Sequence, residues 1–258
     1  MNTTRKLLLA VSLPVLMTAC GGGDGPELPS DEALCSSAGV SPLVNNGASC
    51  AQPGRTAVVI LGISSPLGTS LCSGTMITPT KILTAAHCIP ANTRRVVAGV
   101  WDSQGTVTGN AARRWAVHPQ FQRTSTVLLN DVAVVEMSSP MPNPTMAVLV
   151  SATASSGQGV YIAGWGEPGY DLSVGFTTLS SVDQYSLRYR YNGSLSRACS
   201  GDSGGPIYRV VNGRAAVLGI TSSGPTDCDG NGNLLSTNVQ GSTVLPFIRA
   251  QAPEASYL

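Results

Sequence analysis

The sequence predicts an all-β protein, a barrel or a sandwich built from many short strands. Apolar residues alternate or cluster over short stretches that end at turn-forming residues, as in segments 57–61, 76–78 and 160–162. Glycine, serine and threonine are abundant, which is typical of a chain with frequent turns. A single helix is expected near the C-terminus, from about Thr243 to Ile248, because Pro246 is tolerated in the first turn of a helix.

The composition argues against several classes of protein. The chain has 258 residues, enough for one large or two small domains. Only 11% of the residues are charged, the formal net charge is +1, and there is no basic patch, so we expect no nucleic-acid partner. No heptad or other internal repeat is apparent, which argues against a repeat architecture.

The first residues are typical of an export signal. Arg5 and Lys6 precede an apolar stretch, 7–17, that is too short to span a bilayer as a permanent helix. The sequence Met-Thr-Ala-Cys that ends at Cys20 resembles a bacterial lipoprotein signal, in which the cysteine becomes the acylated first residue. We therefore expect a signal peptide at 1–19, lipidation of Cys20, and a tether or propeptide-like leader at 20–42. Simple secretion is the alternative.

Residues 201–206, Gly-Asp-Ser-Gly-Gly-Pro, have the chemistry of an acyl-transfer nucleophile. A serine hydroxyl needs a neighbouring base and hydrogen-bond donors that face the developing oxyanion. The glycines that flank Ser203 allow a sharp turn and bring backbone N–H groups close to a substrate. The alternative is a glycine- and serine-rich surface turn, and the same residues also fit the G-x-S-x-G pattern of another hydrolase class.

The order of residues along the chain selects the base. His87 and His118 are the two histidines, and both precede Ser203, which is not the order of an α/β-hydrolase. An aspartate-first order would need Asp24 or Asp31, and both lie in a Gly/Pro-rich leader. Small residues surround His87, which makes it the candidate base. His118 precedes a proline, and we interpret it as a surface or packed structural histidine.

Asp131 is the candidate for the third member of a Ser-His-Asp arrangement. It lies in the apolar run 127–135, where a carboxylate is costly unless it has a hydrogen-bonded partner. Its alternative role is that of an ordinary residue at the start of a strand. The other aspartates between His87 and Ser203 have polar or glycine-rich neighbours, or lie too close to the nucleophile: Asp102, Asp171, Asp183 and Asp202.

These motifs together resemble those of the trypsin/chymotrypsin family of serine endopeptidases. The matching pieces occur in the family's order from about residue 44 onward, at 72–74, 84–88, 117–119, 130–133, 164–166, 199–206 and 222–224. The resemblance implies two packed six-stranded antiparallel β-barrels, at 43–150 and 151–258, with a short C-terminal helix. It implies no cofactor. We also expect no metal, because the cysteine spacings lack C-x-x-C pairs.

The resemblance also assigns chemical roles. Ser203 would attack the scissile carbonyl, His87 would take its proton and pass it to the leaving amine, and Asp131 would orient the imidazole. The N–H groups of Gly201 and Ser203 would form the oxyanion hole. The expected reaction is peptide-bond hydrolysis of a polypeptide substrate through an acyl-enzyme intermediate.

Seven cysteines are present, and setting Cys20 aside leaves an even six, which suits an oxidising compartment. Six cysteines allow fifteen pairings in principle. The resemblance pairs Cys72 with Cys88 and Cys199 with Cys228, which leaves Cys35 for Cys50.

Many members of this family are activated by a cut that frees an apolar N-terminus. Here Leu43 or Val44 would be the new first residue, and its ammonium would insert beside Asp202. The residue before the cut is neither Arg nor Lys, which argues against a trypsin-type cut. A disulfide between Cys35 and Cys50 would span the cut, and we expect it to be the one link between the catalytic body and the leader.

The family's specificity pocket maps onto Arg197, Ser222 and Gly224. A positive charge at Arg197 argues against a preference for Lys or Arg side chains. One interpretation is that Arg197 faces the pocket and favours an acidic side chain. We favour the other, in which its stem packs, its guanidinium reaches water and the pocket is small or apolar, because a buried unpaired guanidinium is very costly.

The sequence thus predicts an exported serine endopeptidase, anchored in the outer membrane or periplasm by lipid on Cys20, and acting as a monomer on polypeptides. A catalytically silent envelope-binding lipoprotein on the same fold is one alternative, since a fold does not by itself imply a function. An esterase with the same residues is another.

Overall fold

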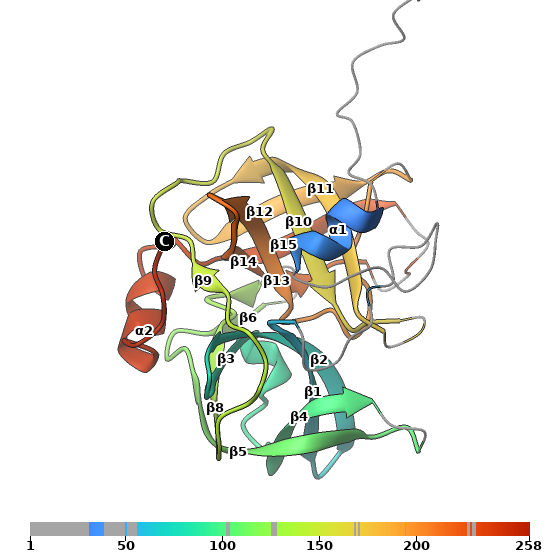
Figure 1. Ribbon diagram of the computed structural model, residues 1–258, viewed down its shortest axis with the longest axis vertical. Helices are drawn as coiled ribbons and strands as arrows, with labels where there is room; N and C mark the ends of the chain where they lie inside the picture. Colours follow the sequence, from blue (N-terminus) through green and yellow to red (C-terminus); the bar gives the residue numbers. More distant parts are fainter. Residues whose placement is uncertain are drawn as a thin grey trace, which may run out of the picture.

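The computed structural model describes residues 31–38, 50, 56–101, 104–124, 128–167, 169, 171–193, 195–225, 228 and 231–258. The predicted signal peptide, the lipidation site Cys20 and the predicted cut at Leu43 or Val44 lie outside these residues. Two β-barrels make up the molecule, with the N-terminal barrel below the C-terminal one in Figure 1.

Six antiparallel strands close the N-terminal barrel in the order β1-β2-β3-β8-β5-β4. Their bounds are β1 (Val58–Ser65), β2 (Gly68–Thr78), β3 (Lys81–Thr84), β4 (Arg95–Trp101), β5 (Val107–Val117) and β8 (Ala133–Met137). β-Branched and leucine side chains such as Ile60, Leu83 and Val135 fill its interior. A small two-stranded sheet of β6 (Gln122–Arg123) and β7 (Leu128–Leu129) lies outside the barrel.

The C-terminal barrel contains six antiparallel strands in the order β13-β10-β11-β12-β15-β14, closed by pairing of β13 with β14. Their bounds are β10 (Gly159–Gly164), β11 (Ser173–Val182), β12 (Ser186–Tyr191), β13 (Pro206–Val211), β14 (Arg214–Ser223) and β15 (Gly232–Asn238). Asn212 and Gly213 both have positive φ, 51° and 73°, as a two-residue turn between twisted strands requires. The short β9 (Ala147–Val148) adds to β14 in parallel.

The predicted fold class is confirmed, and so is the C-terminal helix. That helix, α2 (Val244–Gln251), extends three residues beyond the expected end at Ile248. It packs against the N-terminal barrel: Ile248 is buried in the shared core, and the ring of Phe247 lies 4.9 Å from that of His118. Among the described residues, no helix has the length and apolar character needed to cross a bilayer.

A second helix, α1 (Asp31–Ser37), was not predicted. It belongs to the leader and packs against the C-terminal barrel, where β11 is its neighbour (Figure 1). The helix at each end of the described chain therefore lies on the barrel built mainly from the opposite half of the sequence. Apolar packing and a hydrogen bond between Ser37 and Tyr208 attach the leader as well, which corrects the expectation that the Cys35–Cys50 disulfide is its one link to the body.

The three predicted disulfides are present. Cys35 pairs with Cys50, Cys72 with Cys88 and Cys199 with Cys228, at Cα separations of 5.4, 6.3 and 5.4 Å. Disulfides of this kind form and persist in oxidising environments, so the structure fits an exported protein.

Candidate active site

His87 and Asp131 come from adjacent strands of the N-terminal barrel. β3 pairs with β8 so that Thr84 lies opposite Ala133. His87 follows β3 on a short 3-10 turn, Ala86–Cys88, and Asp131 precedes β8. The pairing of the two strands therefore brings both side chains to the same end of the barrel.

The aspartate is held by the backbone before it. Asn130 has a φ of 52°, in the left-handed region that asparagine tolerates better than most residues. Its amide donates to the backbone oxygen of Gln120 at 3.0 Å, and its Oδ1 accepts from Thr243 Oγ1 at 2.6 Å. These contacts fix the turn that presents Asp131 to the histidine.

His87 donates to Asp131 twice. The backbone N–H of His87 lies 2.8 Å from Oδ1, and ring Nδ1 lies 2.7 Å from Oδ2. The Asp131 side chain is fully buried, whereas 18% of the His87 side chain is exposed. Because the carboxylate accepts from Nδ1–H, the neutral ring carries its lone pair on Nε2, on the side away from Asp131.

Two further residues from the C-terminal barrel contact Asp131. Ser222 Oγ donates to Oδ2 at 2.6 Å, and Thr237 Oγ1 donates to the backbone oxygen of Asp131 at 3.1 Å. A buried carboxylate is stable when its oxygens accept several hydrogen bonds, and here the donors come from both barrels. The sequence placed Ser222 in the specificity pocket and did not single out Thr237, since a threonine in a strand carries no distinguishing signal.

Ser203 lies in a tight turn between Cys199 and β13. The N–H of Asp202 donates to the oxygen of Cys199, and the N–H of Gly205 donates to the oxygen of Asp202. Gly204 has a φ of 84°, and a Cβ there would overlap the backbone oxygen of Ser73 and Oγ1 of Thr84. Glycine is thus required at 204 for both conformation and space.

The turn is attached to the N-terminal barrel. Ser73 N–H donates to the oxygen of Ser203 at 2.8 Å, and Ser73 Oγ donates to the oxygen of Gly201 at the same distance. Ser73 Oγ also accepts from the N–H of Trp165 at 2.9 Å. Ser73 therefore joins the turn that carries Ser203 to the Gly-Trp-Gly turn at 164–166. The sequence identified Ser73 as part of a motif, but its role as a connector depends on the fold.

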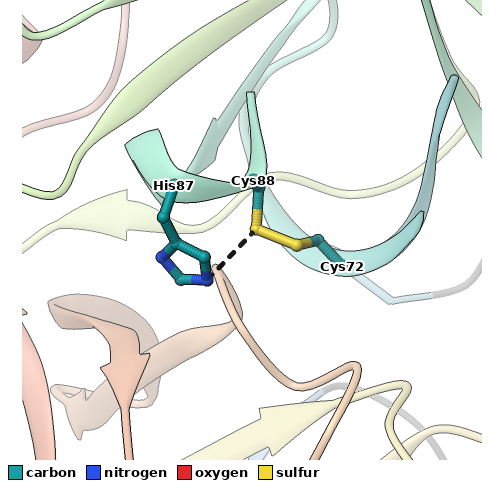
Figure 2. Close-up of side chains that lie close together, drawn as sticks. All are labelled: Cys72, His87 and Cys88. Carbon is teal, nitrogen blue, oxygen red and sulfur yellow. Dashed lines mark hydrogen bonds between the residues drawn. A yellow bond between two sulfur atoms is a disulfide. The ribbon is translucent and has the colours of Figure 1, made fainter. Parts of the chain in front are cut away.

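One sulfur atom lies between the histidine and the serine turn. Figure 2 shows Cys88 Sγ beside the His87 ring, 3.9 Å from Nε2, and the same sulfur lies 3.7 Å from the backbone oxygen of Ser203. Within the described residues, no hydrogen bond joins Ser203 Oγ to His87. Catalytic hydrogen bonds of unliganded enzymes are often long and tighten only when substrate binds.

The cluster of Cys72, His87 and Cys88 in Figure 2 has the residue types of a metal site. Both sulfurs are joined in a disulfide, and His87 Nδ1 is bonded to Asp131. Cysteine binds zinc as a thiolate, so this cluster offers no sulfur ligand while the disulfide is intact. The same holds for the second cluster, in which Cys199 and Cys228 are paired beside Glu167.

The carboxyl group of Asp202 accepts hydrogen bonds from the backbone on two sides. Its Oδ1 accepts from the N–H of Gly166 and its Oδ2 from the N–H of Cys199, both at 2.8 Å. Asp202 is one of the residues that line a cavity of about 270 Å³. Burial raises the pKa of Asp202 to about 6, although the two N–H donors oppose this shift. Apolar side chains, Ile162 and Val174 among them, line the same cavity.

The structure gives each residue predicted for the specificity pocket a different described contact. Arg197 lines the cavity that contains Asp202, and its guanidinium lies over the ring of Tyr191, 5.1 Å from the centroid. Ser222 is buried against Asp131. A Cβ added to Gly224 would lie 3.2 Å from the Leu234 side chain, so Leu234 is next to the expected pocket wall.

His118 is a packed structural residue, as predicted. It is buried, its Nδ1 accepts from the N–H of Gln120 at 3.1 Å, and its Nε2 lies 3.2 Å from the backbone oxygen of Thr243. Both ring nitrogens are thus occupied at the start of α2, so His118 is not available as a catalytic base.

The architecture and the histidine–aspartate pair beside a serine turn define the class of chymotrypsin-like serine proteases. A family model described as "Trypsin" matches residues 44–248, so the chain belongs to the trypsin family.

Curated relatives from animals and bacteria are similar to the chain. A chymotrypsin-like elastase family member 1 from Felis catus is 29% identical over 178 residues, covering 58% of this chain and 67% of the relative. Chymotrypsin-C from Mus musculus is 32% identical over 184 residues, with 59% and 67% covered. A putative peptidase from Corynebacterium glutamicum is 30% identical over 176 residues, with 62% and 57% covered.

A solved structure of HL collagenase has a similar fold. Its TM-score is 0.65 at 19% sequence identity, and the match covers 81% of this chain and 99% of that one. At this identity the likeness concerns the fold alone.

Proposed function

We propose that the protein is a serine endopeptidase in which Ser203 is the nucleophile, His87 the general base and Asp131 the group that orients the imidazole. The observation that carries the proposal is the fully buried carboxylate of Asp131, which accepts both N–H groups of His87 and leaves Nε2 directed away from it. This arrangement supplies a base next to the turn that carries the serine.

The chemical steps follow from these positions. His87 Nε2 takes the proton of Ser203 as Oγ attacks the carbonyl carbon, and Asp131 stabilises the imidazolium that forms. The imidazolium then protonates the leaving amine, and water repeats the sequence on the acyl-enzyme. Within the described residues, the N–H groups of Gly201 and Ser203 donate to no protein acceptor. They are therefore free to bind the oxyanion, a role favoured by the φ of 95° at Gly201.

The test is covalent labelling by an aryl sulfonyl fluoride, followed by hydrolysis assays on matched peptide and ester substrates. We expect labelling of one serine, Ser203, and its loss in Ser203→Ala together with activity, on the order of 10⁶-fold. The exposed Ser151→Ala is the matched control and should behave like the parent. Ester turnover without peptide turnover would indicate an esterase, and absence of labelling in protein whose N-terminus has been freed at Leu43 or Val44 would indicate a silent binding protein.

We propose further that a cut before Leu43 or Val44 activates the enzyme, and that the new N-terminus enters the cavity beside Asp202. The cavity combines an apolar wall with a carboxyl group whose described partners are two backbone N–H groups. An apolar side chain with a free ammonium matches both features. Mass spectrometry of the mature N-terminus tests this, because a fully active chain that still contains residues 20–42 in one piece would exclude it.

For specificity, we propose that the pocket between Ser222 and Gly224 accepts a small or apolar side chain. Arg197 is directed to Tyr191 and to the Asp202 cavity, which supports the interpretation that its charge does not serve as a pocket floor. Comparing kcat/KM for otherwise identical peptides with Ala, Phe, Glu or Arg before the scissile bond provides the test. A preference for Glu would assign Arg197 to the pocket instead.

Export and lipid anchoring complete the proposal. Three disulfides favour an oxidising compartment, and the sequence around Cys20 favours acylation there. The protein would then act in the cell envelope on polypeptides, as a monomer. Cys20→Ser should shift it from the membrane fraction to the soluble fraction, whereas a protein that is simply secreted would be soluble in both forms.

A further inference from the structure

His87 is held in the way that metal-binding histidines are held. Its Nδ1–H donates to the buried carboxylate of Asp131 at 2.7 Å, which leaves the lone pair of Nε2 on the other side of the ring. The carboxylate is fixed in turn, because it also accepts from Ser222 Oγ. Histidines that bind metals commonly donate their second ring nitrogen to a carboxylate, which sets the tautomer and makes the ligating nitrogen more basic. Nε2 of His87 is therefore oriented to bind a metal ion as well as to accept a proton.

Two cysteine sulfurs lie on the Nε2 side of this ring. Cys88 Sγ is 3.9 Å from Nε2, and it is bonded to Cys72 Sγ in the disulfide drawn in Figure 2. One ring nitrogen of His87 and the two sulfurs all lie within 4.8 Å of one another. In a tetrahedral zinc site, a Zn–S bond of about 2.3 Å and a Zn–N bond of about 2.0 Å place sulfur and nitrogen about 3.5 Å apart. Nε2 and Cys88 Sγ are thus close to the spacing of two zinc ligands.

The backbone holds both cysteines by contacts other than the disulfide. Cys72 lies opposite Leu61 where β2 pairs with β1, and the N–H of Cys88 donates to the oxygen of Ala85 within the 3-10 turn. Two thiolates on one zinc ion lie about 3.8 Å apart, farther than the bonded sulfurs of a disulfide. Rotation of the two side chains can supply this separation, because the Cα atoms are 6.3 Å apart.

We propose that reduction of the Cys72–Cys88 disulfide creates a zinc site. A thiol reductant converts the disulfide into two thiols and is itself oxidised to a disulfide. One Zn²⁺ then binds both sulfurs as thiolates, which releases their two protons, and binds Nε2 of His87 as the third ligand. Water fills the fourth position, since zinc in enzymes is found with two cysteines, one histidine and a water molecule. The His87 side chain is 18% exposed, so the ion and the water can reach Nε2 from solvent.

Zinc bound in this way inhibits the enzyme. It occupies Nε2, the atom that takes the proton of Ser203, and this consequence rests on the proposed function. The metal site itself does not rest on it, because binding requires the three ligands and not the reaction. While the disulfide is intact, His87 is the one ligand of the three that remains. Inhibition therefore requires reductant and zinc together.

The first measurement is metal binding by the full chain after reduction with dithiothreitol and desalting under inert gas. Cobalt(II) is the probe, because thiolate ligands give it strong visible absorption and zinc displaces it. The variant with Cys199→Ala and Cys228→Ala lacks a different disulfide, and we expect it to bind one cobalt ion with thiolate absorption. The variant with Cys72→Ala and Cys88→Ala should lose this absorption, and the oxidised parent should lack it. Equal absorption of the two reduced variants would overturn the proposal.

A second variant tests whether the histidine is a ligand. Asp131→Asn should weaken cobalt and zinc binding by about 10- to 100-fold, the effect typical of removing a carboxylate that orients a metal-bound histidine. A site formed by the two sulfurs alone would not respond to this change. Unchanged affinity in Asp131→Asn would therefore contradict the three-ligand site.

Failure of the metal site and failure of the catalytic proposal remain distinguishable. Saturating zinc should abolish sulfonyl fluoride labelling of Ser203 in the reduced chain and leave labelling of the oxidised chain unchanged. If Ser203 is labelled in no form, the catalytic proposal fails, and the cobalt spectrum still decides whether the site exists.

A pair of single variants avoids the reductant if the reduced chain loses its fold by circular dichroism. Cys72→Ala leaves a free thiol at Cys88, next to Nε2, whereas Cys88→Ala leaves one at Cys72. Both variants have the same number of free thiols. Tighter cobalt binding by Cys72→Ala supports the proposal, and equal binding by the two variants contradicts it.

Discussion

The carboxylate of Asp131 accepts two hydrogen bonds from His87: the backbone N–H donates to Oδ1 and the ring Nδ1–H donates to Oδ2. One carboxylate therefore fixes the position of the histidine backbone and the orientation and tautomer of its ring. Rotation of the ring would break a short hydrogen bond to a fully buried acceptor. The fold therefore fixes the direction in which Nε2 points.

Asp131→Asn should lower kcat by about 10⁴-fold, the effect known for this change in a related protease, because the amide favours the wrong imidazole tautomer. The fold should be retained, since the amide fills the same space. Steady-state kinetics on a peptide ester, together with circular dichroism, measures both effects. The exposed Asp171→Asn is the control and should match the parent. A kcat within tenfold of the parent for Asp131→Asn would remove Asp131 from the mechanism.

Ser73→Ala should destabilise the protein by about 1–3 kcal/mol, because the N–H of Trp165 loses its buried acceptor. The serine also donates to the backbone oxygen of Gly201, whose N–H is a proposed oxyanion donor. If loss of this hydrogen bond shifts the Gly201 peptide, kcat should decrease while KM changes little. Urea denaturation and steady-state kinetics are the measurements. The exposed Ser70→Ala, on the same strand, provides the comparison, and equal stability of the two variants would contradict the connecting role.

Ser37→Ala should cost about 1–3 kcal/mol of stability, because the Tyr208 hydroxyl would be buried without its described acceptor. Tyr208→Phe removes the donor itself and should cost less. In the double variant the effect of Ser37→Ala should largely disappear, which a double-mutant cycle by chemical denaturation detects. Additive effects would show that the two hydroxyls do not interact.

Asp202 should make the stability of the uncut chain depend on pH. Burial raises its pKa in the folded chain to about 6, above its ordinary value of 3.8, so the folded state binds more protons than the unfolded state between these values. The stabilisation that the protonated Asp202 carboxyl group contributes is therefore fully present below about pH 4 and is lost as pH rises through 6.

Asp202→Asn should flatten this dependence, so the stability difference between variant and parent should change by about 2–3 kcal/mol between pH 4 and pH 7. Denaturation curves of the uncut chain, with Ser203→Ala present to prevent self-cleavage, provide the measurement. Parallel curves for variant and parent would show that the carboxyl group does not titrate in this range. If the proposed cut places an ammonium beside Asp202, the pKa of Asp202 should fall and the pH dependence of stability should disappear.

The barrels could be predicted because their signals are local or carried by short motifs. The brief apolar stretches that end at turn-forming residues indicate strands, and the family resemblance carried by the motifs around His87 and Ser203 implies two barrels. The leader helix could not be predicted in the same way. Its seven residues contain a single large apolar side chain, Leu34, and its stability comes from packing and the disulfide rather than from its own sequence.

In the candidate site, too, some features have a local sequence signal and others do not. His87 and Asp131 could be identified by residue type and neighbours, and the structure brings them together. The contacts of Ser73 and Thr237 depend on strands that are distant in sequence, so no local pattern reports them. Arg197 was expected at the specificity pocket, but the direction of its side chain depends on the ring of Tyr191, which sequence spacing does not reveal.

Helix α1 packs on the C-terminal barrel and helix α2 on the N-terminal barrel, so the molecule cannot be divided between the barrels without separating a helix from its packing surface. A fragment that ends near residue 150 would lack α2, so the core around His118 would be exposed to water, and a fragment that begins there would leave Tyr208 without α1. We therefore expect neither half to fold on its own. Gene fission between the barrels should therefore yield insoluble halves unless both are produced together, and the intact chain should unfold in one cooperative step.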